Sequence, residues 1–323
     1  MFALNENREI KGPLMSDVLG STLIEMASND PNVLLFSADL AKACGLGEFI
    51  TQLPDQMFDC GIQEANMIGT AAATSEAGMI PFAHTFAAFA SRKCIDQIFL
   101  AACYPQLNLK IIGSDPGITA TTNGASHMGL DDMGMLNSFH NITLLDPSDS
   151  IMLRELLLAA KNQYGVHYIR QFRKCDEKIY REGSKFEIGK GNILKDGEDV
   201  TIIATGIEVP EAMEAAELLA KDKIDARIVD MFTWRPIDRA LILRCAKETG
   251  AIVTAENHIL STGLGSIVAS IVAEEYPVPM GYIGVNERFG EVGSLEFLKK
   301  KFNMKADDIA EKARQVIKRK RLR

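Results

Sequence analysis

Short apolar runs alternate with helical segments along most of this 323-residue chain, and no other feature constrains its fold as much. Apolar residues at helical spacing predict a helix over 16–28 that Ser16 caps, and the uncharged run 33–36 after Pro31 predicts a buried strand. Repeated alternation predicts an α/β fold with parallel or mostly parallel sheets covered by helices on both faces. The other expected strands lie near 79–82, 107–112, 142–145, 166–169, 200–204, 226–229 and 251–255, and the other helices begin near 64, 86 (running to 103), 146, 209 and 263.

The chain is long enough for two domains, and a charged, irregular stretch over 174–198 indicates where they meet. We therefore expect one domain over 12–180 and a second over 190–318. Gly263-Leu264-Gly265 opens a helix in the second domain but lacks the third glycine of a dinucleotide fingerprint, so tight helix–strand packing explains it better.

Composition narrows the class of protein. Apolar residues make up 47% of the chain, charged residues 24%, and the net charge of −8 argues against a nucleic-acid partner. No window approaches the roughly 20 apolar residues of a membrane helix, and the start of the chain lacks a signal-peptide core. Six cysteines without a Cys-x-x-Cys pair favour reduced thiols over a metal site. We expect a cytoplasmic protein with no membrane partner and no metal ligands of its own.

One acid stands out. Glu64 heads a run in which, as far as Phe89, Glu76 is the only other formal charge. A carboxylate beside so much apolar surface is costly to ionise, so it favours a proton or a hydrogen-bonded partner, as catalytic acids do. Its spacing alone is equally consistent with a helix-capping role.

The order of residues around Glu64 resembles the pyrimidine-binding domain of transketolases: Gly61-Ile62-x-Glu64-x-x-Met67, then about twenty residues, then Thr85-Phe86-Ala87-Ala88-Phe89. The second half is similar to the transketolase C-terminal domain, through the motifs at 230–238, 254–258 and 289–293. The resemblance covers residues 12–318. It implies a thiamine diphosphate enzyme that transfers a two-carbon ketol unit from a ketose, phosphorylated or otherwise anionic, to an aldose.

The resemblance also implies roles for individual residues at the coenzyme. Glu64 would contact N1′ of the aminopyrimidine and favour its imino tautomer, which takes up the proton of the reacting carbon. Phe86 and Phe89 would line the ring pocket, although their spacing alone favours core packing. Asp39, after the first strand, would lie near the coenzyme and a dimer interface, or would only cap a turn. Arg92 stands where the family often has a tyrosine, and would contact either the coenzyme or a substrate anion.

On the substrate side, His127 matches a family histidine that contacts the sugar donor, so we expect it to bind the ketose and assist proton transfer. Asp115 and Asn123 stand where the family usually has histidine and aspartate. Arg170 matches an arginine that holds the sugar phosphate. Ser16 and Ala43 replace other members of the family's phosphate clamp. Either Arg173 or Arg92 compensates, or the substrate carries its anion differently or carries none.

The family's magnesium–diphosphate motif, Gly-Asp-Gly followed some 25 residues later by Asn, is absent from this sequence. The resemblance therefore implies a partner subunit, the N-terminal half of a split transketolase, that binds Mg²⁺ and the diphosphate. It also implies self-association through the pyrimidine-binding domain, as an α2β2 assembly.

Two other functions stay open from the sequence. The β subunit of a 2-oxoacid dehydrogenase's decarboxylating component shares the domain pair and the glutamate, but its loop differs around Ser126-His127-Met128-Gly129. A non-catalytic subunit that kept the fold would explain the incomplete phosphate clamp.

Overall fold

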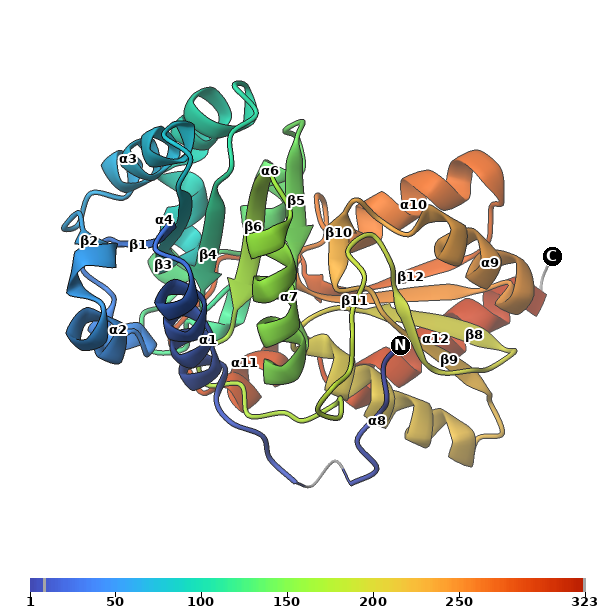
Figure 1. Cartoon of the computed structure of the whole chain (residues 1–323). Coiled ribbons are helices and arrows are strands. Elements are labelled where there is room, and N and C mark those ends of the chain that lie inside the picture. The colour runs from blue at the N-terminus through green and yellow to red at the C-terminus, as the bar shows by residue number, and fades with distance from the viewer. Residues whose placement is uncertain (8–9, 322–323) are drawn as a thin grey trace. The chain divides into compact units, whose positions relative to one another are not determined.

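The computed structural model describes residues 1–7 and 10–321, which divide into two compact units (Figure 1). Unit 1 comprises Met1–Ala120 and Ser126–Ile188, and unit 2 comprises Thr121–Ala125 and Gly189–Arg323. Each unit is built on a mostly parallel sheet flanked by helices, so the predicted α/β class is confirmed.

The sheet of unit 1 has the strand order β5-β6-β4-β3-β1-β2, and these neighbours pair in parallel. Its strands are β1 (Val33–Ser37), β2 (Met57–Asp59), β3 (Ile80–Phe86), β4 (Lys110–Ser114), β5 (Ile142–Leu145) and β6 (Val166–Gln171). Every residue of β1, β4 and β6 is buried, as expected for strands covered on both faces.

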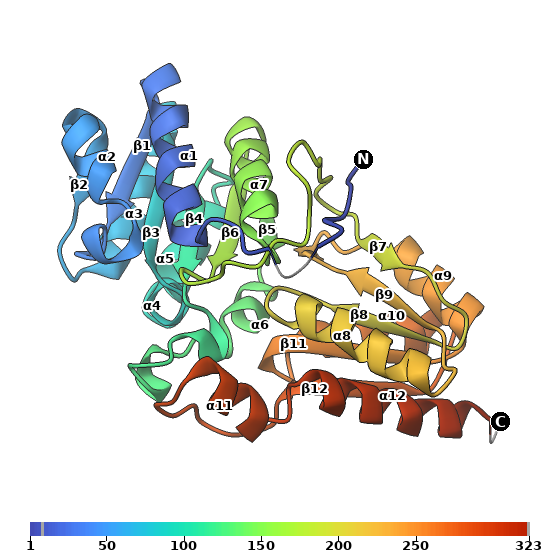
Figure 2. The same cartoon turned by 90° about the horizontal axis from the view of Figure 1, so that it is seen from below.

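Helices cover both faces of this sheet. Figures 1 and 2 show α1 and α7 packed together over one face, with α4 and α6 on the other. The helices of unit 1 are α1 (Met15–Asn29), α2 (Gly47–Gln52), α3 (Glu64–Glu76), α4 (Ala87–Arg92), α5 (Ile95–Gln97), α6 (Asp132–Leu136) and α7 (Ser150–Asn162).

Two local predictions were wrong. Ser16 does not cap α1: the helix begins at Met15, and the backbone N–H groups of Met15 and Ser16 donate to the carbonyls of Cys175 and Arg173 at 3.0 and 3.2 Å, which satisfies the first turn. The continuous helix expected over 86–103 is instead three short pieces, α4, α5 and a π-helical turn over Ile98–Cys103. Phe86 itself stays in β3 because it pairs with Ser114 of β4.

Unit 2 has the strand order β12-β11-β8-β9-β7, parallel except for the β7–β9 pair. Helices α8 and α12 pack together on one face, and α9 and α10 on the other (Figure 1). The elements are β7 (Asn192–Lys195), β8 (Val200–Ala204), β9 (Ala226–Asp230), β10 (Thr233–Arg235), β11 (Ile252–Ile259), β12 (Met280–Val285), α8 (Glu208–Lys221), α9 (Arg239–Thr249), α10 (Leu264–Glu275), α11 (Leu295–Lys301) and α12 (Ala306–Arg321).

The glycines before α10 seat a buried acid. Glu256 of β11 accepts hydrogen bonds from the backbone N–H groups of Leu264 and Gly265 at 2.5 and 2.8 Å. A side chain at Gly263 would collide with that carboxylate. The expected close helix–strand packing is therefore present, and a glutamate rather than a dinucleotide faces the helix N-terminus.

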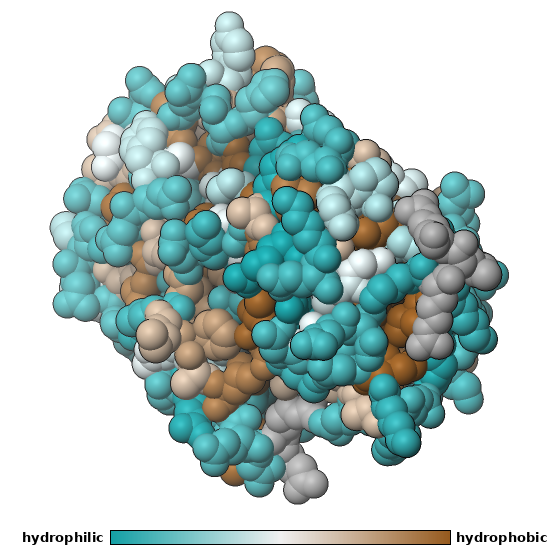
Figure 3. Space-filling model, turned by 90° about the vertical axis from the view of Figure 1, so that its right-hand side faces the viewer, coloured by the Kyte–Doolittle hydropathy of each residue, from teal (hydrophilic) through white to brown (hydrophobic). Residues whose placement is uncertain are grey.

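Hydrophilic residues cover most of the face in Figure 3, and hydrophobic residues reach it in separate groups. Within residues 1–7 and 10–321, no helix combines the length and apolarity needed to span a membrane.

Candidate active site

Several of the predicted residues lie near the carboxyl ends of the unit 1 strands. Strands β3, β4 and β6 end in register at Phe86, Ser114 and Gln171. Glu64 is the first residue of α3, which follows β2, so its carboxylate lies at a helix N-terminus beside the same edge of the sheet. In parallel sheets this edge is where ligands bind.

Phe86, Phe89 and His127 form one aromatic cluster. The ring centroids of Phe89 and His127 are 5.0 Å apart, and those of Phe86 and His127 are 6.0 Å apart, both with steep interplanar angles. Phe86 and Phe89 lie 6.1 Å apart, also edge to face. Phe86 is buried, whereas Phe89 and His127 are half-buried and present part of their rings outward.

Glu64 is only 4% exposed, and Lys93 is its partner. The Lys93 Nζ donates to both carboxylate oxygens at 3.0 Å and lies 4.4 Å from the centroid of the Phe89 ring. The lysine side chain is 47% exposed, so it covers the acid from the solvent side. A cationic nitrogen therefore already occupies the space between the acid and an aromatic face.

A second charged group flanks Phe86. The guanidinium of Arg173 lies 5.1 Å from the Phe86 centroid and donates to Asp115 Oδ2 from Nε at 2.7 Å. Its Nη2 is 2.5 Å from the same oxygen, and its Nη1 donates to the Ala43 carbonyl at 2.6 Å. Asp115 has a φ of 50°, and its backbone N–H donates to the Gln171 carbonyl at 2.8 Å, which fixes the carboxylate in place.

Beside Phe86, a buried polar chain links three strands. His84 Nε2 is 2.7 Å from Ser114 Oγ, and that hydroxyl donates to Gln171 Oε1 at 2.6 Å, so His84 Nε2 carries the proton it donates. Burial, helped by the charge of Arg173, lowers the pKa of His84 to about 3. This imidazole is therefore neutral at physiological pH, and its hydrogen bonds link β3 to β4 and β6.

The structure does not present Arg170 to a substrate. Its side chain is 1% exposed and donates to Asp132 from Nε and Nη2, at 3.0 and 2.5 Å, and to Asp146 from Nη1 at 3.3 Å. Although burial opposes its charge, these two aspartates hold the pKa of Arg170 above its ordinary value. The expected contact with a sugar phosphate does not fit this position, because both carboxylates already neutralise the guanidinium.

Three other predicted residues lie outside the aromatic cluster. Arg92 is bound to Asp131 and to the carbonyl of Met128. Asp39 is exposed two residues after β1, with a φ of 58°, and its backbone N–H donates to Asp59. Asn123 is exposed in the loop after β4 and accepts a hydrogen bond from Thr122.

Sequence reasoning missed two partners. Lys93 follows Phe89 by four residues, a spacing that places both on one side of a helical turn, and this signal would have found it. Asp131 had no such signal, because its contact with Arg92 joins residues 39 positions apart.

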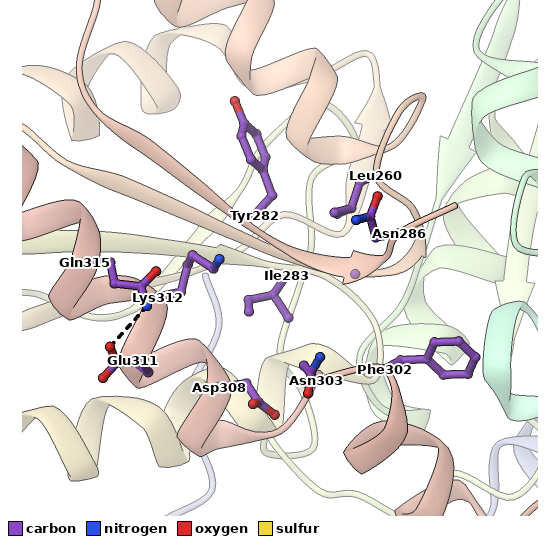
Figure 4. Close-up of a pocket in the computed structure, with 11 residues that line it drawn as sticks. Leu260, Tyr282, Ile283, Asn286, Phe302, Asn303, Asp308, Glu311, Lys312 and Gln315 are labelled. Carbon is purple, nitrogen blue, oxygen red and sulfur yellow. Dashed lines mark hydrogen bonds between the residues drawn. The ribbon is translucent and has the colours of Figure 1, made fainter. Parts of the chain in front are cut away.

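Within the described residues, neither a metal centre nor the hollow in unit 2 competes with this site. In the described residues, no group of three or more His, Cys, Asp or Glu side chains is arranged to hold a metal ion. A hollow of about 340 Å³ lies in unit 2 between β12 and α12. Tyr282, Asn286 and Asp308 are among the residues that line it (Figure 4). It contains none of the predicted site residues.

Comparisons with known proteins agree with the two-unit division. Residues 11–174 match the family "Transketolase, pyrimidine binding domain", and residues 189–309 match "Transketolase, C-terminal domain". The 6-deoxy-6-sulfo-D-fructose transketolase subunit SqwH of Clostridium sp. is 42% identical over 309 residues, which cover 96% of both chains.

Two further relatives match this chain along nearly their whole length. A putative transketolase C-terminal section from Methanocaldococcus jannaschii is 37% identical, over 93% of this chain and 95% of its own. The solved structure of a "split gene transketolase, inactive beta4 tetramer" has a TM-score of 0.87 and 36% identity, over 95% of this chain and 99% of that one.

Proposed function

Because the chain belongs to the transketolase family and spans its pyrimidine-binding and C-terminal domains, we propose that it is the C-terminal-half subunit of a thiamine-diphosphate-dependent ketol transferase. The reaction moves a two-carbon ketol unit from a ketose to an aldose. The observation that carries the proposal is the buried acid Glu64 beside the Phe86–Phe89–His127 cluster. The relatives above are transketolases by name, which favours ketol transfer over 2-oxoacid decarboxylation.

The site residues fit the aminopyrimidine. Both carboxylate oxygens of Glu64 accept hydrogen bonds from the Lys93 Nζ, and the same nitrogen lies over the Phe89 ring. The site therefore offers a hydrogen-bond acceptor and an aromatic face side by side, which are the two contacts that an aminopyrimidine needs. Glu64, Phe86 and Phe89 would hold the ring. When bound, the coenzyme supplies the nucleophilic carbon to which the ketol unit is attached.

Glu64 would hold or share a proton at the oxygen that faces the pyrimidine. For that contact, Lys93 has to release at least one carboxylate oxygen. The exposed stem of Lys93 gives its ammonium room to move into solvent. His127, at the outer side of the aromatic pair, would contact the donor sugar and relay a proton.

For the anionic end of the substrate we propose Arg173 in place of Arg170. Its side chain is 20% exposed, whereas that of Arg170 is 1% exposed. Asp115 already neutralises much of its charge, so a singly charged group such as a sulfonate meets less repulsion there than a phosphate dianion. Asn123, exposed in the same loop as His127, would contact the sugar, and Asp39 would lie near the coenzyme and a dimer interface.

The partner is the subunit that supplies the other half of the site. Relatives that match this chain almost end to end are called a transketolase C-terminal section and a split gene transketolase, the latter an inactive β4 tetramer. We propose that an N-terminal-half subunit brings Mg²⁺ and binds the diphosphate, and that the active assembly is α2β2.

The test is ketol transfer by the chain reconstituted with its N-terminal-half partner, thiamine diphosphate and Mg²⁺. Glu64→Gln and Glu64→Ala should lower the rate by ~100-fold or more, as for loss of a general acid or base. Donors carrying sulfonate, phosphate or no anion then report the role of Arg173, because Arg173→Met should impair anionic donors selectively. Full activity of Glu64→Ala would refute the proposal.

A further inference from the structure

We propose that Arg92 and Asp131 are positioning residues that fix His127 against Phe86 and Phe89. The inference rests on the proposed role of His127 in ketol transfer. It assigns to Arg92 a task different from coenzyme stacking or anion binding.

Arg92 is the last residue of α4 and lies one helical turn after Phe89. Its Nε is 3.1 Å from both oxygens of Asp131, and its Nη2 is 2.9 Å from Oδ1. The same Nη2 donates to the Met128 carbonyl at 2.7 Å. One guanidinium therefore links the helix that carries Phe89 to two points of the loop directly after His127.

The backbone between those two points already touches α4. A Cβ at Gly129 would lie 2.9 Å from the Ala88 nitrogen and 3.1 Å from the Ala87 carbonyl carbon. Gly129 also accepts a hydrogen bond from Gly117 N–H at 2.9 Å. The segment after His127 thus packs against the start of α4, and Arg92 binds the same segment from the other end of that helix.

Asp131 is committed to this contact rather than to its own helix. It occupies the N-cap position of α6, where an aspartate ordinarily accepts a backbone N–H, yet its side chain makes no capping hydrogen bond. Instead the carboxylate faces Arg92 in a side-on pair.

A purely stabilising role would gain little from this pair. Both side chains are 37% exposed, and exposed ion pairs contribute little to folding stability. The catalytic rate depends more strongly on how His127 is oriented, because a displacement of about 1 Å in a catalytic group can lower the rate substantially. The local neighbour of His127 on its other side is Ser126, whose Oγ lies 2.9 Å from Nδ1 in an exposed loop.

The experiment uses the reconstituted complex with thiamine diphosphate and Mg²⁺. It compares Arg92→Met, Asp131→Asn, His127→Ala and the double variant Arg92→Met/His127→Ala. Arg92→Met and Asp131→Asn should each lower kcat/KM for the donor about tenfold and leave the apparent Kd for thiamine diphosphate unchanged. Because Arg92 acts through His127, Arg92→Met should have no further effect in the His127→Ala background.

Arg154→Met is the matched control, since Arg154 is also 37% exposed, pairs with Glu25 at 2.6 Å, and lies on α7; it should leave activity unchanged. The inference is overturned if the losses in kcat/KM caused by Arg92→Met and His127→Ala multiply in the double variant. It is also overturned if Arg92→Met weakens coenzyme binding or has no effect on ketol transfer. If His127→Ala keeps full activity, the inference also falls. If Glu64→Ala retains full ketol-transfer activity, the proposed function itself is refuted instead.

Discussion

Two requirements meet at the side chain of Glu64. It is a buried acid in the first turn of α3, and Lys93 contacts both of its carboxylate oxygens at 3.0 Å. As the proposed partner of a pyrimidine nitrogen it has to hold or share a proton. The acid itself was predictable, because an isolated carboxylate in an apolar run is visible in the sequence. Lys93 was not predicted, although its spacing of four residues from Phe89 is a signal that the sequence contains.

In the proposed site, Lys93 occupies the same acid and the same ring face as the coenzyme and so competes with it. We therefore predict that Lys93→Met binds thiamine diphosphate about tenfold more tightly in the reconstituted complex. The estimate combines an ion pair and a cation–π contact, each on the order of 0.5–1 kcal/mol, at about 1.4 kcal/mol per factor of ten. Coenzyme titration by isothermal calorimetry measures the change.

Lys161→Met is the control for Lys93→Met, because Lys161 also forms a lysine–carboxylate pair at 3.0 Å, in its case with Asp30. It should leave the coenzyme affinity as it is. Lys93→Arg, which keeps the charge, should stay close to the wild type. Weaker or unchanged binding by Lys93→Met would show that the lysine supports the pocket instead of competing for it.

At the scale of helices and strands, the spacing of apolar residues predicted most elements of unit 1 but not the residues at which they begin and end. The helix expected to open at Asp146-Pro147-Ser148 begins at Ser150, and the cap is Asp149, whose Oδ1 accepts from Met152 N–H at 2.8 Å. Its Oδ2 accepts from the N–H groups of Ile179 and Tyr180 at 2.9 and 2.8 Å. These last contacts join segments some 30 residues apart, so no local sequence pattern predicts them.

Asp149 therefore holds both α7 and the chain after β6, and we predict that Asp149→Ala lowers the free energy of unfolding by ~3 kcal/mol. About 1 kcal/mol is the lost cap, and the rest is two buried N–H groups left without an acceptor. Urea unfolding followed by circular dichroism measures the loss. Ser294→Ala removes a single capping bond from an exposed helix start and should cost ~1 kcal/mol or less; equal losses in both variants would contradict the argument.

The same carboxyl group makes stability depend on pH. Burial outweighs the hydrogen bonds from Met152, Tyr180 and Ile179 and raises the pKa of Asp149 to about 6, from an ordinary value of 3.8. Between these values the folded chain binds more protons than the unfolded chain, so this group's contribution to stability falls as pH rises from about 4 to about 6. Comparing the wild type with Asp149→Ala across that range isolates the slope, which should be absent from the variant.

At the scale of the whole molecule, the sequence was sufficient for the fold class and the family, because both depend on patterns spread over 300 residues. The anion contact predicted for Arg170 does not fit its buried position, and Arg173 is proposed in its place. Arg170 and Arg173 are three positions apart, and only the fold shows that Asp132 and Asp146 enclose the first while the second flanks Phe86. Which arginine meets the substrate thus depends on tertiary neighbours rather than on a motif.

Because we propose that this chain binds only the pyrimidine end of the coenzyme, we predict that it shows no ketol transfer alone, at any concentration of thiamine diphosphate and Mg²⁺. Added N-terminal-half partner should restore transfer, with activity saturating at one partner per chain, as an α2β2 assembly requires. Because the partner is proposed to bind the diphosphate through Mg²⁺, chelation should abolish coenzyme binding by the complex. Analytical ultracentrifugation beside the activity titration measures the stoichiometry. Turnover by the chain alone, or saturation at another ratio, would contradict the shared site.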